Sequence, residues 1–168
     1  MGDEYLEIAN EDDEVIGLAS REESHKNGLI HRSVHIFVFN SKGELFIQKR
    51  GNTKDQCPLF YDSSAAGHVD RGESYYDCAT RELKEELGIE ADIKKLATIK
   101  ACQETGWEHV NFFLCYSDDQ ITLNPDEIET GAFCSIETVQ KMLKNEENRV
   151  TPSFRKLFGI WLEQNRKP

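Results

Sequence analysis

Hydrophobic and polar residues alternate along much of the chain, and this alternation predicts several short β-strands. The clearest case is residues 33–39, where Val34, Ile36 and Val38 would share one face of a strand. A Ser-Lys-Gly turn then leads into a second strand at residues 45–50. The remaining strands are expected at residues 5–8 and 14–18, as a hairpin, and at 59–64, 93–104, 110–116 and 130–135.

Three other segments follow the period of a helix. In residues 74–87 the apolar side chains recur every three or four positions, so they share one helical face. These side chains are Tyr76, Ala79, Leu83 and Leu87. Two further helices are expected at residues 136–143, after Ser135 as a cap, and at residues 153–164, after Pro152. Strands on both sides of one strong central helix predict the α/β class, with a mixed sheet layered between helices.

Length and composition favour an ordinary enzyme-sized domain. The 168 residues fit one domain, residues 1–168, with a single sizeable core. No apolar stretch is long enough to span a bilayer, and the acidic start lacks the pattern of a signal peptide, so we expect a cytoplasmic protein without membrane contact. Five scattered cysteines without a C-x-x-C pair indicate reduced thiols. A net charge of −11 argues against an extended nucleic-acid partner.

The most specific pattern is GHVDRGESYYDCATRELKEELGI, at residues 67–89. Three glutamates, Glu82, Glu85 and Glu86, crowd beside the apolar stripe of the predicted helix. Like charges at this spacing destabilise a helix by a few tenths of a kcal/mol per pair, and a hard divalent cation would compensate them. A solvated acidic face would explain the glutamates, but not Arg81 or the two glycines at their fixed spacings.

This segment is identified as a Nudix box, G-x5-E-x7-R-E-U-x-E-E-x-G-U with U a bulky aliphatic residue, and it matches at every fixed position. The resemblance implies a Nudix-type α/β/α sandwich with a catalytic loop-helix-loop. It also implies Mg²⁺ or Mn²⁺ held by Glu82, Glu85 and Glu86, with the backbone carbonyl of Gly67 as a further ligand. In such enzymes the residue that matches Arg81 orients neighbouring carboxylates and is neither acid nor base.

The implied reaction is hydrolysis of a diphosphate linkage, in a nucleoside diphosphate or another small diphosphate joined to a group X. Glu82 ranks first as the general base, and Glu127 and Glu129 on a later acidic loop rank behind it. Arg50 and Lys54 precede the Gly67 loop, and we expect them to contact the phosphates of the substrate. A non-catalytic binding module would be expected to carry a degraded box, and this box is intact.

The segment around the box is similar to a narrower branch, which contains isopentenyl-diphosphate isomerases and related Nudix hydrolases. The residues that carry this similarity are His31, Phe39, Asn40, Gly43, Arg50, Lys54, Pro58, Ser64, Gly67, His68, Gly72, Glu73 and Ser74. The similarity implies a second metal site at His25, His31 and His68.

Two departures weigh against an isomerase, which remains the alternative function. Isomerases of this branch have a catalytic cysteine where this chain has Ala66. They also carry a Glu-x-Glu pair in the strand that matches residues 107–110, and on the simplest alignment His109 replaces the catalytic glutamate. Because moving a double bond needs two positioned acid/base groups, the hydrolase is preferred.

Overall fold

The structure is a computed structural model that describes residues 5–165, so the predicted domain limits at residues 1 and 168 lie outside the described part. In chain order its elements are β1 (Tyr5–Ala9), β2 (Val15–Ser20), α1 (Arg21–Asn27), β3 (His31–Phe39), β4 (Leu45–Arg50), β5 (Tyr61–Asp62), β6 (Ala65–His68), α2 (Tyr75–Leu87), β7 (Ile93–Ile99), the 3-10 turn η1 (Gln103–Thr105), β8 (Glu108–Tyr116), β9 (Ile128–Cys134), α3 (Ile136–Lys144) and α4 (Pro152–Asn165). None of these helices has the length and apolar character that crossing a membrane requires.

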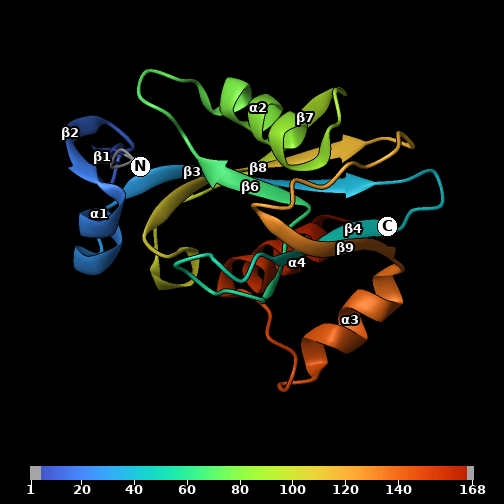
Figure 1. Cartoon of the computed structure of the whole chain (residues 1–168). Helices are drawn as coiled ribbons and strands as arrows, with labels where there is room; N and C mark the ends of the chain where they lie inside the picture. The colour runs from blue at the N-terminus through green and yellow to red at the C-terminus, as the bar shows by residue number, and fades with distance from the viewer. Residues whose placement is uncertain (1–4, 166–168) are drawn as a thin grey trace.

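Helices cover both faces of the seven-stranded main sheet, with α2 on one side and α4 on the other (Figure 1). The alternation along β3 decides which side chains meet which helix. Val34, Ile36 and Val38 pack toward α2, whereas Phe37 and Phe39 pack toward α3 and α4. Because β3 runs parallel to β8 and antiparallel to β6, the sheet is mixed. The predicted α/β sandwich is therefore confirmed.

The main sheet forks along one edge of β3. Residues 33–36 of β3 pair with β6, so β3 meets β4 at the single pair Phe39–Leu45. Ser64 stands at the fork, where its hydroxyl donates to the Phe46 carbonyl and accepts from the Val38 N–H. The predicted strand at residues 59–64 is wrong in extent, because Ser64 carries the chain from the edge of β4 to the edge of β3.

The predicted strand at residues 93–104 is also too long. β7 ends at Ile99, and the chain then enters η1, which Gly106 terminates in the left-handed conformation at φ 66°. The hydroxyl of Thr105 accepts from the Cys102 N–H and so holds this turn together. The turn places residues 103–108 at the rim of the cavity described below.

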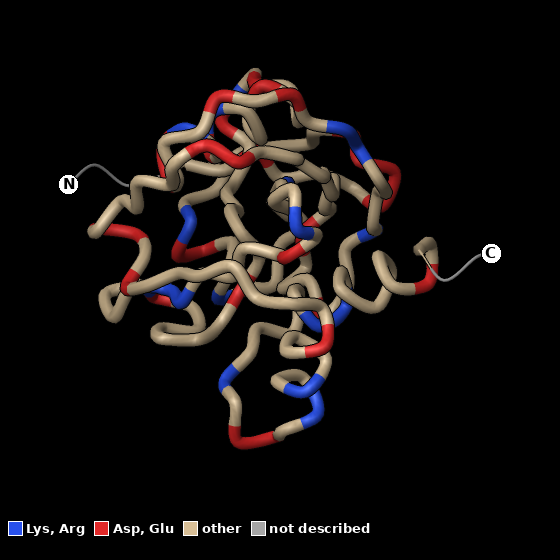
Figure 2. The backbone as a smooth tube through the Cα atoms, turned by 90° about the vertical axis from the view of Figure 1, so that its right-hand side faces the viewer, with Lys and Arg blue, Asp and Glu red and all other residues tan. Residues whose placement is uncertain are grey.

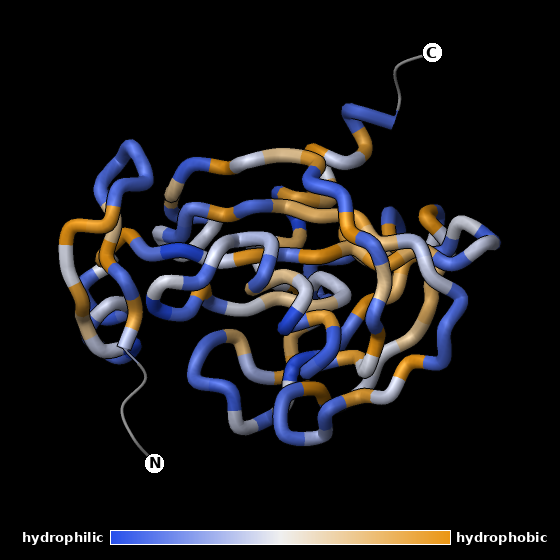
Figure 3. The backbone as a smooth tube through the Cα atoms, turned by 90° about the horizontal axis from the view of Figure 1, so that it is seen from above, coloured by the Kyte–Doolittle hydropathy of each residue, from blue (hydrophilic) through white to orange (hydrophobic). Residues whose placement is uncertain are grey.

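The hairpin β1–β2 forms a separate two-stranded sheet at one side of the molecule, seen from above in Figure 3. Polar contacts connect it to the main sheet: Arg32 donates to Asp13 over 2.7 Å, and His109 Nε2 donates to the Asn10 carbonyl over 2.8 Å. The short helix α1 follows directly and was not predicted. The Ser20 side chain accepts from the Glu23 N–H at its start, a capping pattern that the sequence carries.

Acidic and basic positions are interspersed over the surface. Figure 2 shows the Lys and Arg positions scattered among the more numerous Asp and Glu positions, without a continuous basic stripe in that view. All five cysteines are free thiols, as expected. Neither feature suggests an extended nucleic-acid surface or a disulfide framework.

Candidate functional site

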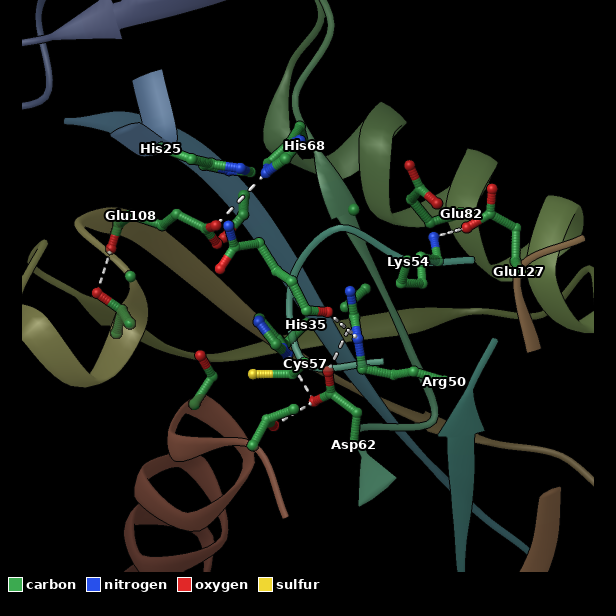
Figure 4. Close-up of a pocket in the computed structure, with 18 of the residues that line it drawn as sticks. His25, His35, Arg50, Lys54, Cys57, Asp62, His68, Glu82, Glu108 and Glu127 are labelled. Atoms are coloured by element: carbon green, nitrogen blue, oxygen red, sulfur yellow. Dashed lines mark hydrogen bonds and ion pairs between the residues drawn. The ribbon is translucent and has the colours of Figure 1, made fainter. Parts of the chain in front are cut away.

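A cavity of about 570 Å³ opens beside the fork of the sheet, between α2, the loop at residues 51–60, η1 and the start of α4. This volume is in the usual range for a small-molecule site. Three groups of side chains lie around it in Figure 4. The first contains the glutamates of α2 with Lys54, the second contains histidines with Glu108, and the third contains His35, Cys57, Asp62 and Arg50.

Arg81 organises the acidic side of α2. The helix begins at the Ser74 cap and ends at Gly88, which is left-handed at φ 68°. Arg81 donates two hydrogen bonds of 2.9 Å to Glu73, and these raise the pKa of the guanidinium. Its Nη1 also donates to Glu82 over 2.6 Å and to Glu85 over 3.2 Å. A single cation therefore connects the loop before α2 to two of the box glutamates.

Glu86 lies inside the fork of the sheet. Its Oε2 accepts from the Gln48 side chain on β4 over 2.9 Å and from the Ala66 N–H on β6 over 3.2 Å. Burial raises the pKa of Glu86 to about 8, the neighbouring Glu82 adds to this rise, and Lys54 opposes it. The fork thus holds a carboxyl group of α2 between β4 and β6, where it lines the cavity.

Glu82 packs against the backbone of Gly67, so closely that a Cβ at position 67 would overlap its carboxylate. Only glycine leaves room for this approach. Burial raises the pKa of Glu82, and the charge of Arg81 opposes the rise. Glu85 is different, because its side chain is 56% exposed at the mouth of the site.

The two predicted phosphate-binding residues both line the cavity, and both have acidic partners. Lys54 forms an ion pair with Glu127, as Figure 4 shows, and burial lowers the pKa of its ammonium. Arg50 donates to Asp62 over 3.2 Å and to the Gln56 carbonyl over 3.2 Å. Glu129 is exposed on β9 and is not among the residues that line the cavity, so the structure does not bring it to the site.

The donor set on α2 fits Mg²⁺ or Mn²⁺ in chemistry, because it consists of carboxylate oxygens. Two of these carboxyl groups, Glu82 and Glu86, are buried close together, and buried like charges need a counter-charge. The nearest cations are Arg81 and Lys54. The three glutamates do not gather to within 4.8 Å of one another, because Arg81 holds Glu82 and Glu85 while Gln48 holds Glu86.

Four other residues do gather this closely. Among residues 5–165, the one set of His, Cys, Asp or Glu side chains whose ligand atoms all lie within 4.8 Å is His25, His31, His68 and Glu108. The three imidazole rings are 5.0–5.3 Å apart between centroids. Glu108 Oε1 is 3.4 Å from the Nε2 atoms of His31 and His68, whose hydrogen bonds and charges outweigh burial and keep the pKa of Glu108 well below its usual value.

The orientation of His31 supports a ligand at this cluster. Its Nδ1 donates to the Leu29 carbonyl over 2.8 Å, which leaves Nε2 as an acceptor facing the cluster. Nε2 is buried and makes no hydrogen bond of regular geometry within the described chain, and the Glu108 carboxylate at 3.4 Å is its charged neighbour. A histidine held through one nitrogen, with the other directed at neighbouring ligands, is the usual arrangement in metal sites.

Glu108 was missed by the sequence analysis, which expected His109 in place of an acidic group. The structure corrects this assignment: His109 points away from the cavity, accepts from the Ala101 N–H over 3.1 Å and donates to Asn10. Glu108 reaches the cavity because residue 108 pairs with His31 across the parallel strands β3 and β8. No motif spacing in the sequence reveals that pairing.

A comparison with protein families identifies the chain. The model described as the NUDIX domain matches residues 29–154, well over half of the sequence. The chain belongs to the Nudix family. The Nudix hydrolase YfcD of Escherichia coli K12, itself uncharacterised, is 31% identical over 170 residues, which cover 98% of this chain and 89% of YfcD.

Two further relatives match nearly the whole chain. The isopentenyl-diphosphate Delta-isomerase 1 of Photorhabdus laumondii subsp. laumondii is 30% identical over 170 residues, with 96% of this chain and 97% of the isomerase covered. The crystal structure of DR0079 from Deinococcus radiodurans has a TM-score of 0.82 and 28% identity, with 92% of this chain and 97% of that chain covered. The predicted family and its enzyme class are therefore confirmed, and similarity extends to hydrolase and isomerase relatives alike.

Proposed function

We propose that this Nudix protein hydrolyses a diphosphate linkage in a nucleoside diphosphate or a related diphosphate-X compound, with Mg²⁺ or Mn²⁺ at Glu82, Glu85, Glu86 and the Gly67 carbonyl. The observation that carries the proposal is the pair of buried carboxyl groups, Glu82 and Glu86, in one cavity with Arg50 and Lys54. Carboxylates for a cation and side-chain cations for a polyanion are the two requirements of phosphate chemistry.

Each residue has a distinct role in this proposal. The bound cation would neutralise charge on the diphosphate and lower the pKa of a water molecule. Arg81 holds Glu82 and Glu85 in place through its hydrogen bonds. Glu82 is the first candidate for general base, because it lies deep in the cavity against Gly67. Glu127 is second, because it is paired with Lys54 and would be released when Lys54 turns to a phosphate.

We further propose that His25, His31, His68 and Glu108 form the second metal site. The support is the buried Nε2 of His31, which faces the cluster beside Glu108, and the approach of all four ligand atoms to within 4.8 Å. Imidazole nitrogens with a carboxylate suit a transition metal such as Mn²⁺ or Zn²⁺ better than Mg²⁺. This cluster is also what favours the alternative function, an isopentenyl-diphosphate isomerase. Ala66 in the cavity wall opposes it, because alanine has no acid/base group.

The test is a hydrolysis screen of diphosphate compounds with metal-depleted protein, to which Mg²⁺ or Mn²⁺ is returned, with released phosphate species as the readout. Glu85→Gln and Glu86→Gln each remove one charge and keep the side-chain shape, so turnover should fall by orders of magnitude while the fold survives. Glu137→Gln on α3 is the matched control, because Glu137 is exposed and pairs only with Lys141 on its own helix. Normal turnover in Glu86→Gln at saturating Mg²⁺ would refute the metal assignment.

A further inference from the structure

One part of the cavity serves neither the proposed metals nor the phosphates. On the face of β3 toward α4, the side chains change from polar to aromatic along the strand: His31, Ser33 and His35 come before Phe37 and Phe39. Ser33 and His35 both line the cavity, and His35 lies beside Asp62 in Figure 4. In a strand that is otherwise apolar in its centre, two buried polar side chains need a reason.

Ser33 lacks a partner. Its side chain belongs to a residue only 2% exposed, and its hydroxyl makes no hydrogen bond within residues 5–165. The register puts Ser33 between His68 on β6 and Val110 on β8, and Ser33 lines the cavity. Burying a hydroxyl without a partner is unfavourable, and a ligand would relieve this cost.

His35 offers a second polar group beside it. Its Nδ1 lies 2.8 Å from the Ser63 hydroxyl, and its Nε2 has no hydrogen-bond partner in the described chain. Burial lowers the pKa of His35, so the ring is neutral near pH 7 and can donate or accept. Figure 4 shows the ring beside Cys57 and Asp62 at the base of the cavity.

The charged groups beside Ser33 and His35 are paired with each other in this structure. Asp62 accepts from Arg50 over 3.2 Å and from the Thr151 hydroxyl over 2.9 Å, so its charge is already balanced. Gln103 and Thr105 from η1 also line the cavity. This part of the cavity is thus polar and close to neutral.

We infer that Ser33 and His35 form a recognition subsite for an uncharged, hydroxyl- or amide-bearing group X on the diphosphate, and that the site disfavours a hydrocarbon X. The inference rests on the proposed function for the position of the diphosphate. A hydrocarbon group here would leave the Ser33 hydroxyl unpaired, whereas a sugar or base edge would satisfy it. Sites built around hydrogen bonds discriminate strongly against analogues that cannot make them.

The test measures binding separately from turnover. Calorimetry with Mg²⁺-loaded protein would compare two methylene-bridged diphosphate analogues that cannot be hydrolysed, one bearing uridine and one bearing an isopentenyl chain. The parent protein should bind the uridine analogue at least tenfold more tightly. Ser33→Ala should reduce that preference about five- to tenfold, by weakening the uridine analogue alone, because one hydrogen bond is lost.

The variants are chosen so that folding does not obscure the result. Ser33→Ala removes a hydroxyl that has no partner in the protein, so the melting temperature should stay the same or rise. His35→Asn, a second variant, keeps a polar side chain that can reach toward Ser63. Ser135→Ala, at the cap of α3 and outside the cavity, should leave the preference unchanged.

Equal affinity of the parent for both analogues, or an unchanged preference in Ser33→Ala and His35→Asn, would overturn the inference. Hydrolysis of uridine diphosphate is measured in parallel. Tight, Ser33-dependent binding of the uridine analogue without any hydrolysis would refute the proposed function and leave the subsite standing.

Discussion

Replacing Gly67 by alanine isolates the contact on which the proposed metal site depends. Gly67 lies in β6 and is not among the glycines with positive φ, so alanine fits the backbone without strain. The added methyl group, however, would stand 2.6 Å from Glu82 Oε2 and nearer still to the other carboxylate atoms. Ordinary contacts of this kind are about 3.5–4.0 Å, so the carboxylate must move by roughly 1 Å or more.

The two expected effects of Gly67→Ala differ in size. The fold should lose about 1–3 kcal/mol, as for other small-to-large changes in packed sites, and the lower value is expected because a side-chain end can move. A displacement of about 1 Å in a catalytic group costs on the order of 10²-fold in rate. Steady-state kinetics at saturating Mg²⁺, together with thermal melting, would measure both effects. The control is Gly159→Ala on α4, where a Cβ meets nothing within 4 Å.

A double variant tests the cause. If Gly67→Ala acts by displacing Glu82, it should cost little further activity in a Glu82→Gln background, because contacting residues are not additive. Parent-like kcat/KM in Gly67→Ala would show that the position of the Glu82 carboxylate against β6 is irrelevant to the chemistry. If the losses of activity caused by Gly67→Ala and by Glu82→Gln add fully in the double variant, the loss in Gly67→Ala has some other cause than displacement of Glu82.

Three further outcomes are expected. Arg50→Ala and Lys54→Ala should each lower kcat/KM about tenfold or more, whereas Lys42→Ala in an exposed turn should not. Arg50→Ala should also lower the melting temperature, because the buried Asp62 loses its cationic partner. Parent-like kinetics in both variants would exclude phosphate contacts. Isopentenyl diphosphate incubated with the protein should show no double-bond migration by NMR, because Ala66 offers no acid/base group. Catalytic formation of dimethylallyl diphosphate would make isomerisation the main function. Burial lowers the pKa of His35, so the contribution of its neutral ring to the stability of the fold is full above about pH 6.5 and is lost as the pH falls below that value. His35→Asn should therefore flatten the acid side of the plot of melting temperature against pH. An unchanged profile would contradict this reasoning.

The local features of the sequence predicted the parts of the site that lie on one element. The helix of the box was predicted to within one residue, because its cap at Ser74 and its terminator Gly88 are both local signals. The faces of β3 were also predictable, since the two-residue period fixes them. The strand ends at Ile99 and Asp62 were not predicted: a turn held by Thr105 follows Ile99, and the contact of Ser64 with the distant Phe46 follows Asp62.

The pairings between distant segments could not be predicted from the sequence. Glu108 and His31 meet because β3 and β8 are parallel neighbours, a fact of topology that neither segment encodes alone. Glu86 reaches the cavity because β3 pairs with β6 and with β4 along one edge. The Nudix box identified the candidate metal-binding carboxylates, but the fork in the sheet determines which of them are buried.

The charge distribution of the cavity implies that metal and substrate bind interdependently. Each predicted phosphate-binding cation already has an acidic partner, Asp62 for Arg50 and Glu127 for Lys54. A polyanion that arrived alone would have to compete with these carboxylates and approach Glu82 and Glu86 as well. A cation on the glutamates of α2 would reduce this repulsion, and the phosphates of the substrate would then compete with Glu127 for Lys54. The excess of acidic residues in the chain is thus compatible with an anionic substrate, provided that the metal is bound with it or before it.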